Sequence, residues 1–159
     1  MKEKARVLII DDNANMRETL ADILEEKGYE VVATRTAREG IQAAGKFFFN
    51  IHLIDINLPD KTGIELLRDF RTAYPLRINI MITASATLKY AVDALNIGAN
   101  AYILKPIDFT NLEQTMKECL RKQAPTLKAT NERLTAFMTS TEITTEEQCT
   151  CQDEKQKTD

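Results

Sequence analysis

Four short apolar runs, each followed at once by an acidic, hydroxyl or basic residue, constrain what this chain can fold into. Runs that are apolar at successive positions, rather than at every second one, are typical of parallel strands covered on both faces. Parallel strands of one sheet end at the same edge, so the residues that follow them come together there. The runs and their terminal residues are Val7–Ile10 with Asp11 and Asp12, Ile51–Ile54 with Asp55, Ile78–Ile82 with Thr83, and Ala101–Leu104 with Lys105.

Patterns typical of amphipathic helices alternate with these runs as far as residue 122. Apolar residues recur there at helical spacing, and Gly28, Pro75 and Gly98 stand where helices would end. Strands that alternate with helices predict an α/β domain, here a doubly wound five-stranded parallel sheet with Val31–Ala33 as its second strand. The expected helices contain Met16–Leu24, Ala37–Phe48 with Thr36 or Thr34 as N-cap, Ile64–Phe70, Thr87–Asn96 with Ala91, Val92 and Leu95 facing inward, and Asn111–Lys122.

The expected strand order is 2-1-3-4-5, as in flavodoxin-like folds. This order places the shortest strand, Val31–Ala33, at an edge of the sheet, and the first and third strands side by side. Asp11, Asp12 and Asp55 then flank the crevice between those two strands, where open α/β sheets bind ligands. The predicted fold and the position of the acidic residues therefore agree.

The last part of the chain differs from the rest. Residues 1–122 of the 159 carry the strand and helix patterns, whereas 123–159 form a polar, Thr-rich tail. We expect this tail to be a short helix followed by disorder, with one apolar stripe made by Leu127, Leu134, Phe137 and Met138. A tail of about 35 polar residues cannot bury a second core, so we expect no DNA-binding output domain.

Charge and hydropathy limit the partners of the chain. The net charge of −3, with scattered Lys and Arg, provides no field that attracts nucleic acid. No apolar run reaches the roughly 7–15 residues of a signal peptide or the about 20 residues of a membrane span. Three cysteines without a disulfide pattern fit a reducing compartment. We therefore expect a cytoplasmic protein that binds neither nucleic acid nor a membrane directly.

The acidic residues at the first and third strand ends have two interpretations. Asp11, Asp12 and Asn13 would also suit the start of a helix, as a cap followed by acidic residues. Asp55 favours a metal site instead, because three clustered carboxylates repel one another unless a cation lies among them. Carboxylate oxygens are ligands that Mg²⁺ prefers. The cluster therefore predicts a magnesium site.

Asp55, Lys105 and Thr83 together are typical of phosphoryl transfer. A carboxylate that attacks phosphorus forms an acyl phosphate, and catalysis then consists mostly of positioning and charge neutralisation. Lys105 would offer a positive charge to the phosphoryl oxygens, and Thr83 would offer a hydroxyl donor. Thr is common in strands and Lys-Pro in loops, so it is their placement at successive strand ends that indicates this chemistry.

One ordered set of motifs covers residues 5–122: Asp11-Asp12, Asp55 with Leu58-Pro59-Asp60 and Gly63, Thr83-Ala84, and Tyr102-x-x-Lys105-Pro106. This set resembles the response-regulator receiver domain of two-component signalling, in its single-domain form. The resemblance implies that Asp55 is the phosphoacceptor and takes a phosphoryl group from a histidine kinase or phosphotransfer protein. It also implies Mg²⁺ as cofactor, held by Asp12, Asp55 and the backbone carbonyl of Asn57, with Asp11 acting mainly through water.

The resemblance further implies a switch made of Thr83 and Tyr102. Thr83 would move toward the phosphoryl group and Tyr102 would turn inward, and a target would sense the change on the face made by the fourth helix, fifth strand and fifth helix. Asn57 and Ser85 occupy the positions that tune hydrolysis in this family, and both are small and polar. We therefore expect the phosphoryl group to last minutes rather than days. The residues near the rim expected to contact the phosphodonor are Ala14, Met16 and Ile107.

Three alternative functions are consistent with these residues. The chain is a receiver that binds a downstream target or relays phosphate, a receiver that acts through its tail by dimerising or docking a kinase, or a metal-dependent phosphatase or phosphotransferase with an Asp nucleophile. A homodimer formed on phosphorylation belongs to the first two. The third is disfavoured, since such phosphatases carry a second acid where Asn57 stands, and an amide cannot protonate a leaving group. We expect no enzyme activity beyond the chain's own phosphorylation and dephosphorylation.

Other conspicuous residues are expected to be structural. The only histidine, His52, lies within the third strand and should pack in the core. Phe47–Phe49 should span the end of the second helix and its packing. Cys149 and Cys151 are too few ligands for a metal site.

Overall fold

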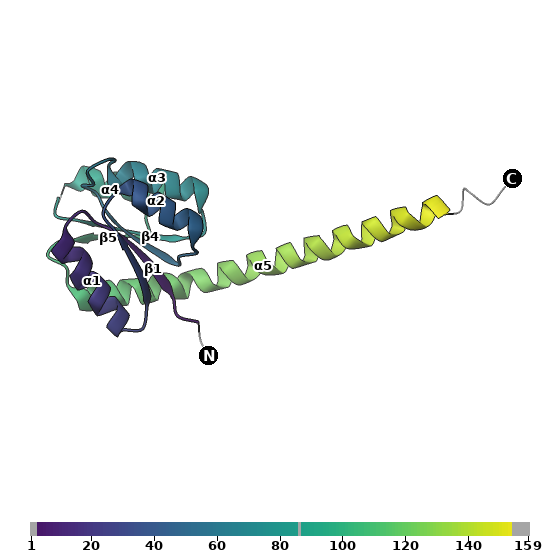
Figure 1. Ribbon diagram of the computed structural model, residues 1–159, viewed down its shortest axis with the longest axis horizontal. Coiled ribbons are helices and arrows are strands. Elements are labelled where there is room, and N and C mark those ends of the chain that lie inside the picture. The colour runs from purple at the N-terminus through teal and green to yellow at the C-terminus, as the bar shows by residue number, and fades with distance from the viewer. Residues whose placement is uncertain (1–2, 86, 154–159) are drawn as a thin grey trace. The chain divides into compact units, whose positions relative to one another are not determined.

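The computed structural model of the chain describes residues 3–85 and 87–153, with side chains as far as residue 136. Five parallel strands in the order β2-β1-β3-β4-β5 alternate with five helices in this part of the chain (Figure 1). This confirms the predicted doubly wound α/β fold. The strands are β1 (Arg6–Ile10), β2 (Glu30–Thr34), β3 (Ile51–Asp55), β4 (Ile78–Thr83) and β5 (Ala101–Leu104); the helices are α1 (Ala14–Glu26), α2 (Ala37–Lys46), α3 (Gly63–Ala73), α4 (Leu88–Ile97) and α5 (Phe109–Asp153).

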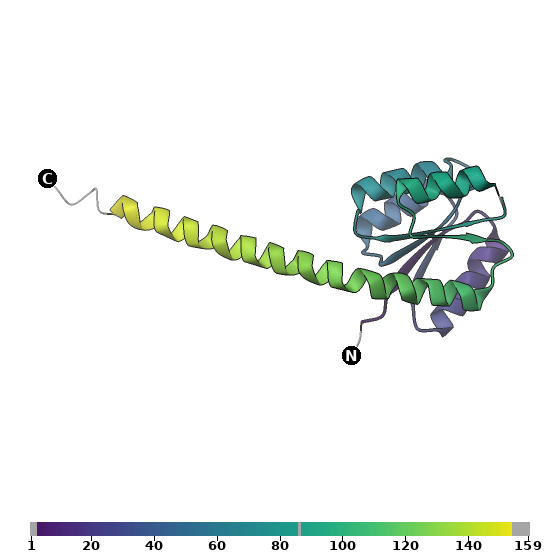
Figure 2. The same ribbon diagram turned by 180° about the vertical axis from the view of Figure 1, so that it is seen from behind.

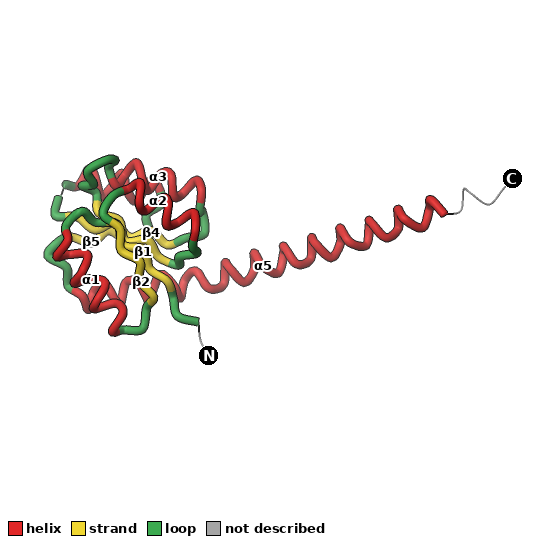
Figure 3. The backbone as a smooth tube through the Cα atoms, viewed as in Figure 1, coloured by secondary structure: helices red, strands yellow, loops and turns green. Residues whose placement is uncertain are grey.

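Helices cover both faces of the sheet, which explains why the central strands are apolar on successive residues. Helices α2, α3 and α4 lie on one face, and α1 and the first part of α5 lie on the other (Figures 2 and 3). Every residue of β3 and β4 is buried. Alternate side chains of β1 enter two separate core clusters, Leu8 and Ile10 on one face and Val7 and Ile9 on the other. The strand ends are thereby held rigidly between two packed layers.

Local signals fix where the helices begin and end. Asn13, Thr36 and Thr62 are N-caps whose side chains accept backbone hydrogen bonds, so Thr36 rather than Thr34 caps α2. Glu65 completes a capping box with Thr62 at the start of α3. Gly98 adopts a left-handed conformation after α4, as the sequence suggested.

The predicted inward face of α4 is wrong, and α2 packs through small residues rather than large ones. Ile41 and Phe48 are exposed, and the sheet-facing side of α2 consists of small residues such as Gly40. A Cβ at Gly40 would lie 2.6 Å from Cδ1 of Ile10, so α2 approaches β1 too closely for a large side chain. In α4, Val92 and Leu95 point outward and Ala94 alone is buried. The apolar residues of α4 lie on several sides of the helix, so their spacing did not identify the side that packs against the sheet.

The tail also differs from expectation, since α5 continues as one helix from Phe109 to Asp153 rather than ending near residue 122. The chain divides into two units, Met1–Leu120 and Arg121–Asp159. Threonine hydroxyls within the helix, such as that of Thr130, donate to the carbonyl four residues earlier and so have a partner. Pro125 lies inside the helix. The side chains of Phe137, Met138, Cys149 and Cys151 lie outside the described residues.

Candidate functional site

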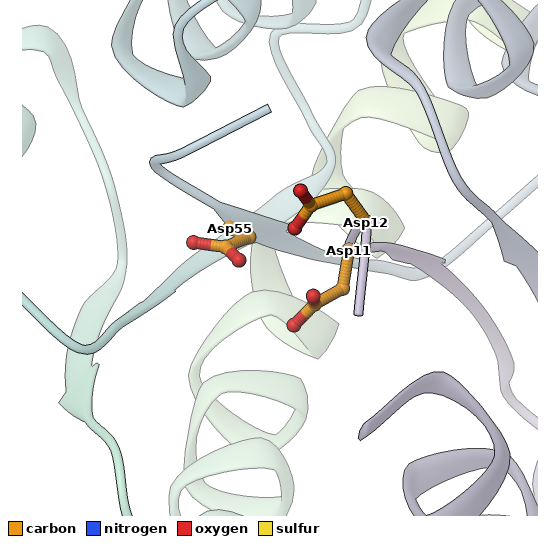
Figure 4. A group of neighbouring side chains, drawn as sticks. All are labelled: Asp11, Asp12 and Asp55. Atoms are coloured by element: carbon orange, nitrogen blue, oxygen red, sulfur yellow. The ribbon is translucent and has the colours of Figure 1, made fainter. Parts of the chain in front are cut away.

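Three carboxylates meet at the carboxyl ends of β1 and β3 (Figure 4). Asp11, Asp12 and Asp55 each offer an oxygen, and these oxygens all lie within 4.8 Å of one another. Asp11 and Asp55 are buried, whereas Asp12 is exposed. The pairing of β1 with β3 in parallel produces this arrangement, because Ile10 and Ile54 lie side by side immediately before the acids.

Lys105 connects two of these carboxylates. Its Nζ lies 2.8 Å from Oδ2 of Asp11 and 3.1 Å from Oδ2 of Asp55. The lysine reaches them from the position directly after β5, and its peptide bond to Pro106 is cis. One ammonium group therefore neutralises part of the charge of two buried acids that come from different strands.

Backbone N–H groups hold the carboxylates from the other side. The N–H of Asn13 donates to Oδ1 of Asp11 at 2.9 Å, and the N–H of Asn57 donates to Oδ1 of Asp55 at 3.1 Å. Arg17 donates to the backbone carbonyl of Asp11 at 2.9 Å. Each buried acid thus has one oxygen toward Lys105 and the other toward a backbone donor two residues later.

Burial and charge shift the ionisation of the site. Burial raises the pKa of Asp55, as does the charge of Asp11, while the hydrogen bond from Asn57 and the contact with Lys105 oppose the rise. For Lys105, burial lowers the pKa, but its hydrogen bonds to Asp11 and Asp55 outweigh burial and raise it. The lysine consequently stays positive at neutral pH.

The three carboxylates fit a hard divalent cation. Mg²⁺ takes one or two carboxylates and completes its octahedron with water, phosphate oxygens or carbonyls. Asp12 is exposed and makes no ion pair among the described residues, whereas Asp11 is occupied by Lys105. Asp12 is therefore the carboxylate of the three that is most open to a cation, because Asp11 and Asp55 are both buried and both contact Lys105.

Thr83 and Tyr102 are linked through the backbone of Ser85. The N–H of Ser85 donates to Oγ1 of Thr83 at 3.0 Å, and the hydroxyl of Tyr102 donates to the carbonyl of Ser85 at 3.0 Å. Thr83 is fully buried at the end of β4, and Tyr102 packs partly against the core. Sequence reasoning placed Ser85 as a position that tunes hydrolysis, and did not find that its backbone joins the other two residues.

The loop after Asp55 is fixed by two contacts that are not apparent from spacing. The N–H of Gly63 donates to the carbonyl of Ile56 at 2.8 Å, and a Cβ at Gly63 would lie 2.2 Å from the carbonyl oxygen of Asp55. Asp60 accepts backbone hydrogen bonds from Ala37 and Arg38 at the start of α2. The loop therefore ties β3 to both α3 and α2.

The remaining candidates are dispersed. His52 is buried in β3, as expected, and its Nδ1 lies 2.9 Å from Oδ1 of Asn79. Met16 and Ile107 are partly buried against the core, whereas Ala14 is exposed. Of the three phenylalanines, Phe49 is buried and Phe47 and Phe48 are half-exposed.

Comparison with known proteins assigns the family. The family model described as the response regulator receiver domain matches residues 7–117. The chain belongs to the response regulator receiver family. Every residue of the site described above lies within the matched segment.

Solved receiver structures share the fold. A CheY-like receiver domain protein from Methanospirillum hungatei JF-1 is 41% identical with a TM-score of 0.75, over 77% of this chain and 98% of that one. TrrA from Thermotoga maritima, solved in complex with Mg²⁺ and BeF, is 25% identical with a TM-score of 0.67, over 72% of this chain and 98% of that one. The similarity thus covers nearly the whole of each of these proteins.

Curated relatives are longer regulators. The uncharacterized transcriptional regulatory protein YkoG of Bacillus subtilis is 32% identical over 76% of this receiver and 53% of its own length. Transcriptional regulatory protein ZraR of Escherichia coli K12 is 29% identical over 72% of this receiver and 26% of its own length. The receiver therefore spans about half or less of these relatives. In the described residues, no helix is long and apolar enough to cross a membrane.

Proposed function

We propose that this receiver accepts a phosphoryl group on Asp55 from a histidine kinase or phosphotransfer protein, in a reaction that requires Mg²⁺. The observation that supports this most is the position of Lys105, whose ammonium lies between the buried carboxylates of Asp11 and Asp55. A buried carboxylate beside a fixed cation and an acidic pair has what nucleophilic attack on phosphorus requires.

In the proposed step, an oxygen of Asp55 attacks the phosphorus of the donor's phosphohistidine. A bond from phosphorus to the Asp55 oxygen forms as the bond from phosphorus to nitrogen breaks, and the product is an acyl phosphate. Lys105 contacts Asp55 before the reaction. After it, the ammonium would contact an oxygen of the phosphoryl group, which carries the negative charge. When bound by Asp12, Asp55 and the carbonyl of Asn57, Mg²⁺ supplies neutralisation of the phosphoryl charge.

The phosphoryl group would be sensed through Thr83 and Tyr102. A phosphoryl group carries about −1.5 to −2 charge at pH 7, so a hydroxyl donor at Thr83 gains a strong acceptor. The signal would leave through α4 and β5, where Leu88, Leu95 and Leu104 are large apolar residues exposed to solvent. A downstream target protein, or a homodimer formed on phosphorylation, would cover this face. The solved beryllofluoride-activated NtrC4 receiver, 29% identical with a TM-score of 0.71, is a dimer.

This role is that of a switch in the cytoplasm rather than of a turnover enzyme. Asn57 supplies an amide where an acid–base catalyst would need a carboxylate. Asn57 and Ser85 leave the phosphoryl group open to water, so we expect it to last minutes. Label that survives for a day would contradict this lifetime.

The test is labelling by a small acyl-phosphate donor with Mg²⁺. In Asp55→Asn, incorporation of phosphate should vanish while the circular dichroism spectrum and the unfolding transition persist. The matched control is Asp22→Asn on the exposed side of α1, which should label as the wild type does. Label retained at another residue of Asp55→Asn would refute the assignment. Continuous release of many equivalents of phosphate from a phosphomonoester would favour the phosphatase alternative.

A further inference from the structure

Leucines recur every seven residues along α5, at Leu120, Leu127 and Leu134. Leu120 packs against the core of the first unit. Leu134 is 56% exposed. Ala124 and Asn131 occupy the positions four residues after Leu120 and Leu127. This is the spacing of a heptad repeat, in which leucine stands at d and Ala124 and Asn131 stand at a.

The side chains of α5 after Leu120, as far as residue 136, are exposed or only partly buried. An isolated helix gains little from propensity alone, and most helical stability in proteins comes from packing an apolar face. Pro125 removes one further backbone hydrogen bond from this segment. A packed partner helix would therefore stabilise it.

We propose that α5 beyond Leu120 forms a parallel two-stranded coiled coil with a second copy of this chain. Leu127 and Leu134 occupy the d positions of the seam, and Ala124 and Asn131 occupy the a positions. In sequence, Met138 continues the a positions by one more heptad. This pairing does not involve Asp55, so it holds whether or not the receiver is phosphorylated.

Asn131 identifies both the partner and its direction. Its carboxamide makes no hydrogen bond within the described part of the chain, whereas its carbonyl accepts from Thr135. In a parallel pair, Asn131 faces Asn131 of the second copy, and the two amides bond to each other across the seam. In an antiparallel pair it would face a leucine, and a buried amide would lose its partner.

The neighbouring positions agree with this register. In a parallel dimer, Gln123 would lie beside Lys128 of the other helix and Thr130 beside Thr135, so no like charges meet at the seam. The hydroxyl of Thr130 already donates to Thr126 at 2.9 Å within its own helix. Pro125 falls at b, on the outside of the pair. An alternative seam through Leu127 and Thr130 would bury Thr130 and leave Asn131 outside.

The first test is the mass of the full chain by sedimentation equilibrium over a range of concentrations. The wild type should approach twice its monomer mass of 18.0 kDa. Leu127→Ala with Leu134→Ala should weaken the dimer by about tenfold or more, because both d layers lose their side chains. Thr126→Ala with Arg133→Ala has the same spacing one residue earlier, at c positions, and should leave the dimer intact.

Asp55→Asn separates this proposal from phosphorylation, since the variant should still dimerise. A wild type that remains monomeric overturns the coiled coil. A dimer that survives loss of both leucines also overturns it, because the copies would then meet through another face. A dimer that appears only with Mg²⁺ and beryllofluoride counts against it as well.

Crosslinking tests the register independently. In a chain with Cys119, Cys149 and Cys151 replaced by alanine, Asn131→Cys should form an intermolecular disulfide on oxidation, because a positions face each other. Glu132→Cys, at b, should not. Equal crosslinking of the two variants, or crosslinking only at 132, would refute the seam.

Discussion

Tyr102 donates a hydrogen bond from its hydroxyl to the backbone carbonyl of Ser85, 3.0 Å away. Burial raises the pKa of Tyr102, so the hydroxyl keeps its proton and remains a donor throughout the neutral range. The N–H of the same residue, Ser85, donates to Thr83. Movement of Thr83 toward a phosphoryl group would displace the residue that Tyr102 is bonded to. The end of β4 and the middle of β5 are thus coupled through one residue.

Tyr102→Phe should uncouple sensing from phosphorylation. The substitution removes only the hydroxyl, at a cost of about 1 kcal/mol, which corresponds to about fivefold in the switch equilibrium. Phosphate incorporation at Asp55 should stay near the wild-type rate. The change in amide hydrogen exchange of residues 88–104 on adding Mg²⁺ and beryllofluoride should shrink.

Tyr90→Phe is the control for that experiment, since Tyr90 lies exposed on α4 and its loss should leave the exchange response unchanged. An undiminished response in Tyr102→Phe would show that the Ser85 bond does not transmit the signal. A large drop in labelling would instead place Tyr102 in the reaction itself.

Lys105→Met should slow labelling and strengthen the binding of Mg²⁺. The ammonium is a fixed donor beside the carboxylate that we propose reacts, and loss of one such donor lowers the rate by about 10²-fold or more. Without it, Asp11 and Asp55 keep their full repulsion, so a metal ion relieves more unfavourable charge. Labelling kinetics and the rise in melting temperature on adding Mg²⁺ measure the two effects.

Lys89→Met, on the exposed start of α4, removes the same charge elsewhere and should change neither quantity. If Lys105→Met bound Mg²⁺ more weakly than the wild type, the lysine would be supporting the metal site rather than competing with it.

The sequence was enough to predict the sheet and the cluster at its edge, but not the connections within them. β1, β3 and β4 were predictable because apolar residues at successive positions suit only strands covered on both faces. The outward position of Leu95 was not, since α4 is apolar on several sides and packing against the sheet selects Ala94. The hydrogen bond between Tyr102 and Ser85 depends on a side-chain rotamer, which the spacing of residues in the sequence does not specify.

The length of α5 was missed for a different reason. Thr residues have low helix propensity, so a Thr-rich segment was expected to be disordered. In the helix, Thr115, Thr130 and Thr135 each bond to the carbonyl four residues earlier, and the residues between them are largely Leu, Lys, Glu, Arg and Ala. The Thr content of the segment did not reveal that strong helix formers separate the threonines.

The stability of the fold should fall between pH 6.5 and pH 4 because of His52. Burial, only partly offset by the hydrogen bond with Asn79, lowers the pKa of His52 to about 4 from its ordinary 6.5. The unfolded chain therefore binds a proton below pH 6.5, while the folded chain does not until about pH 4. The stability lost over this window reaches about 3 kcal/mol.

Urea unfolding of the wild type and of His52→Gln at pH 7.5 and pH 4.5 measures this loss. Gln keeps an amide donor for Asn79 but does not titrate. The difference between the free energies of unfolding of the two proteins should therefore change by most of that amount between the two pH values. His52→Leu should also lack the pH dependence, though it removes the hydrogen bond at Oδ1 of Asn79 and should be less stable throughout. Parallel profiles for the wild type and His52→Gln would show that another group dominates.

Gly63→Ala should destabilise the fold and disturb the site together. A Cβ at position 63 would lie 2.2 Å from the carbonyl oxygen of Asp55 and 2.7 Å from Cα of Ile56, both backbone atoms that cannot move without shifting Asp55. We expect a loss of about 1–3 kcal/mol in the free energy of unfolding and slower labelling of Asp55.

Gly45→Ala is the matched control, because a Cβ there meets nothing within 4 Å. It lies within α2 and should stabilise by roughly 0.5–1 kcal/mol, with labelling unchanged. If Gly63→Ala were as stable and as reactive as the wild type, the close approach of α3 to Asp55 would not be what holds that carboxylate in place.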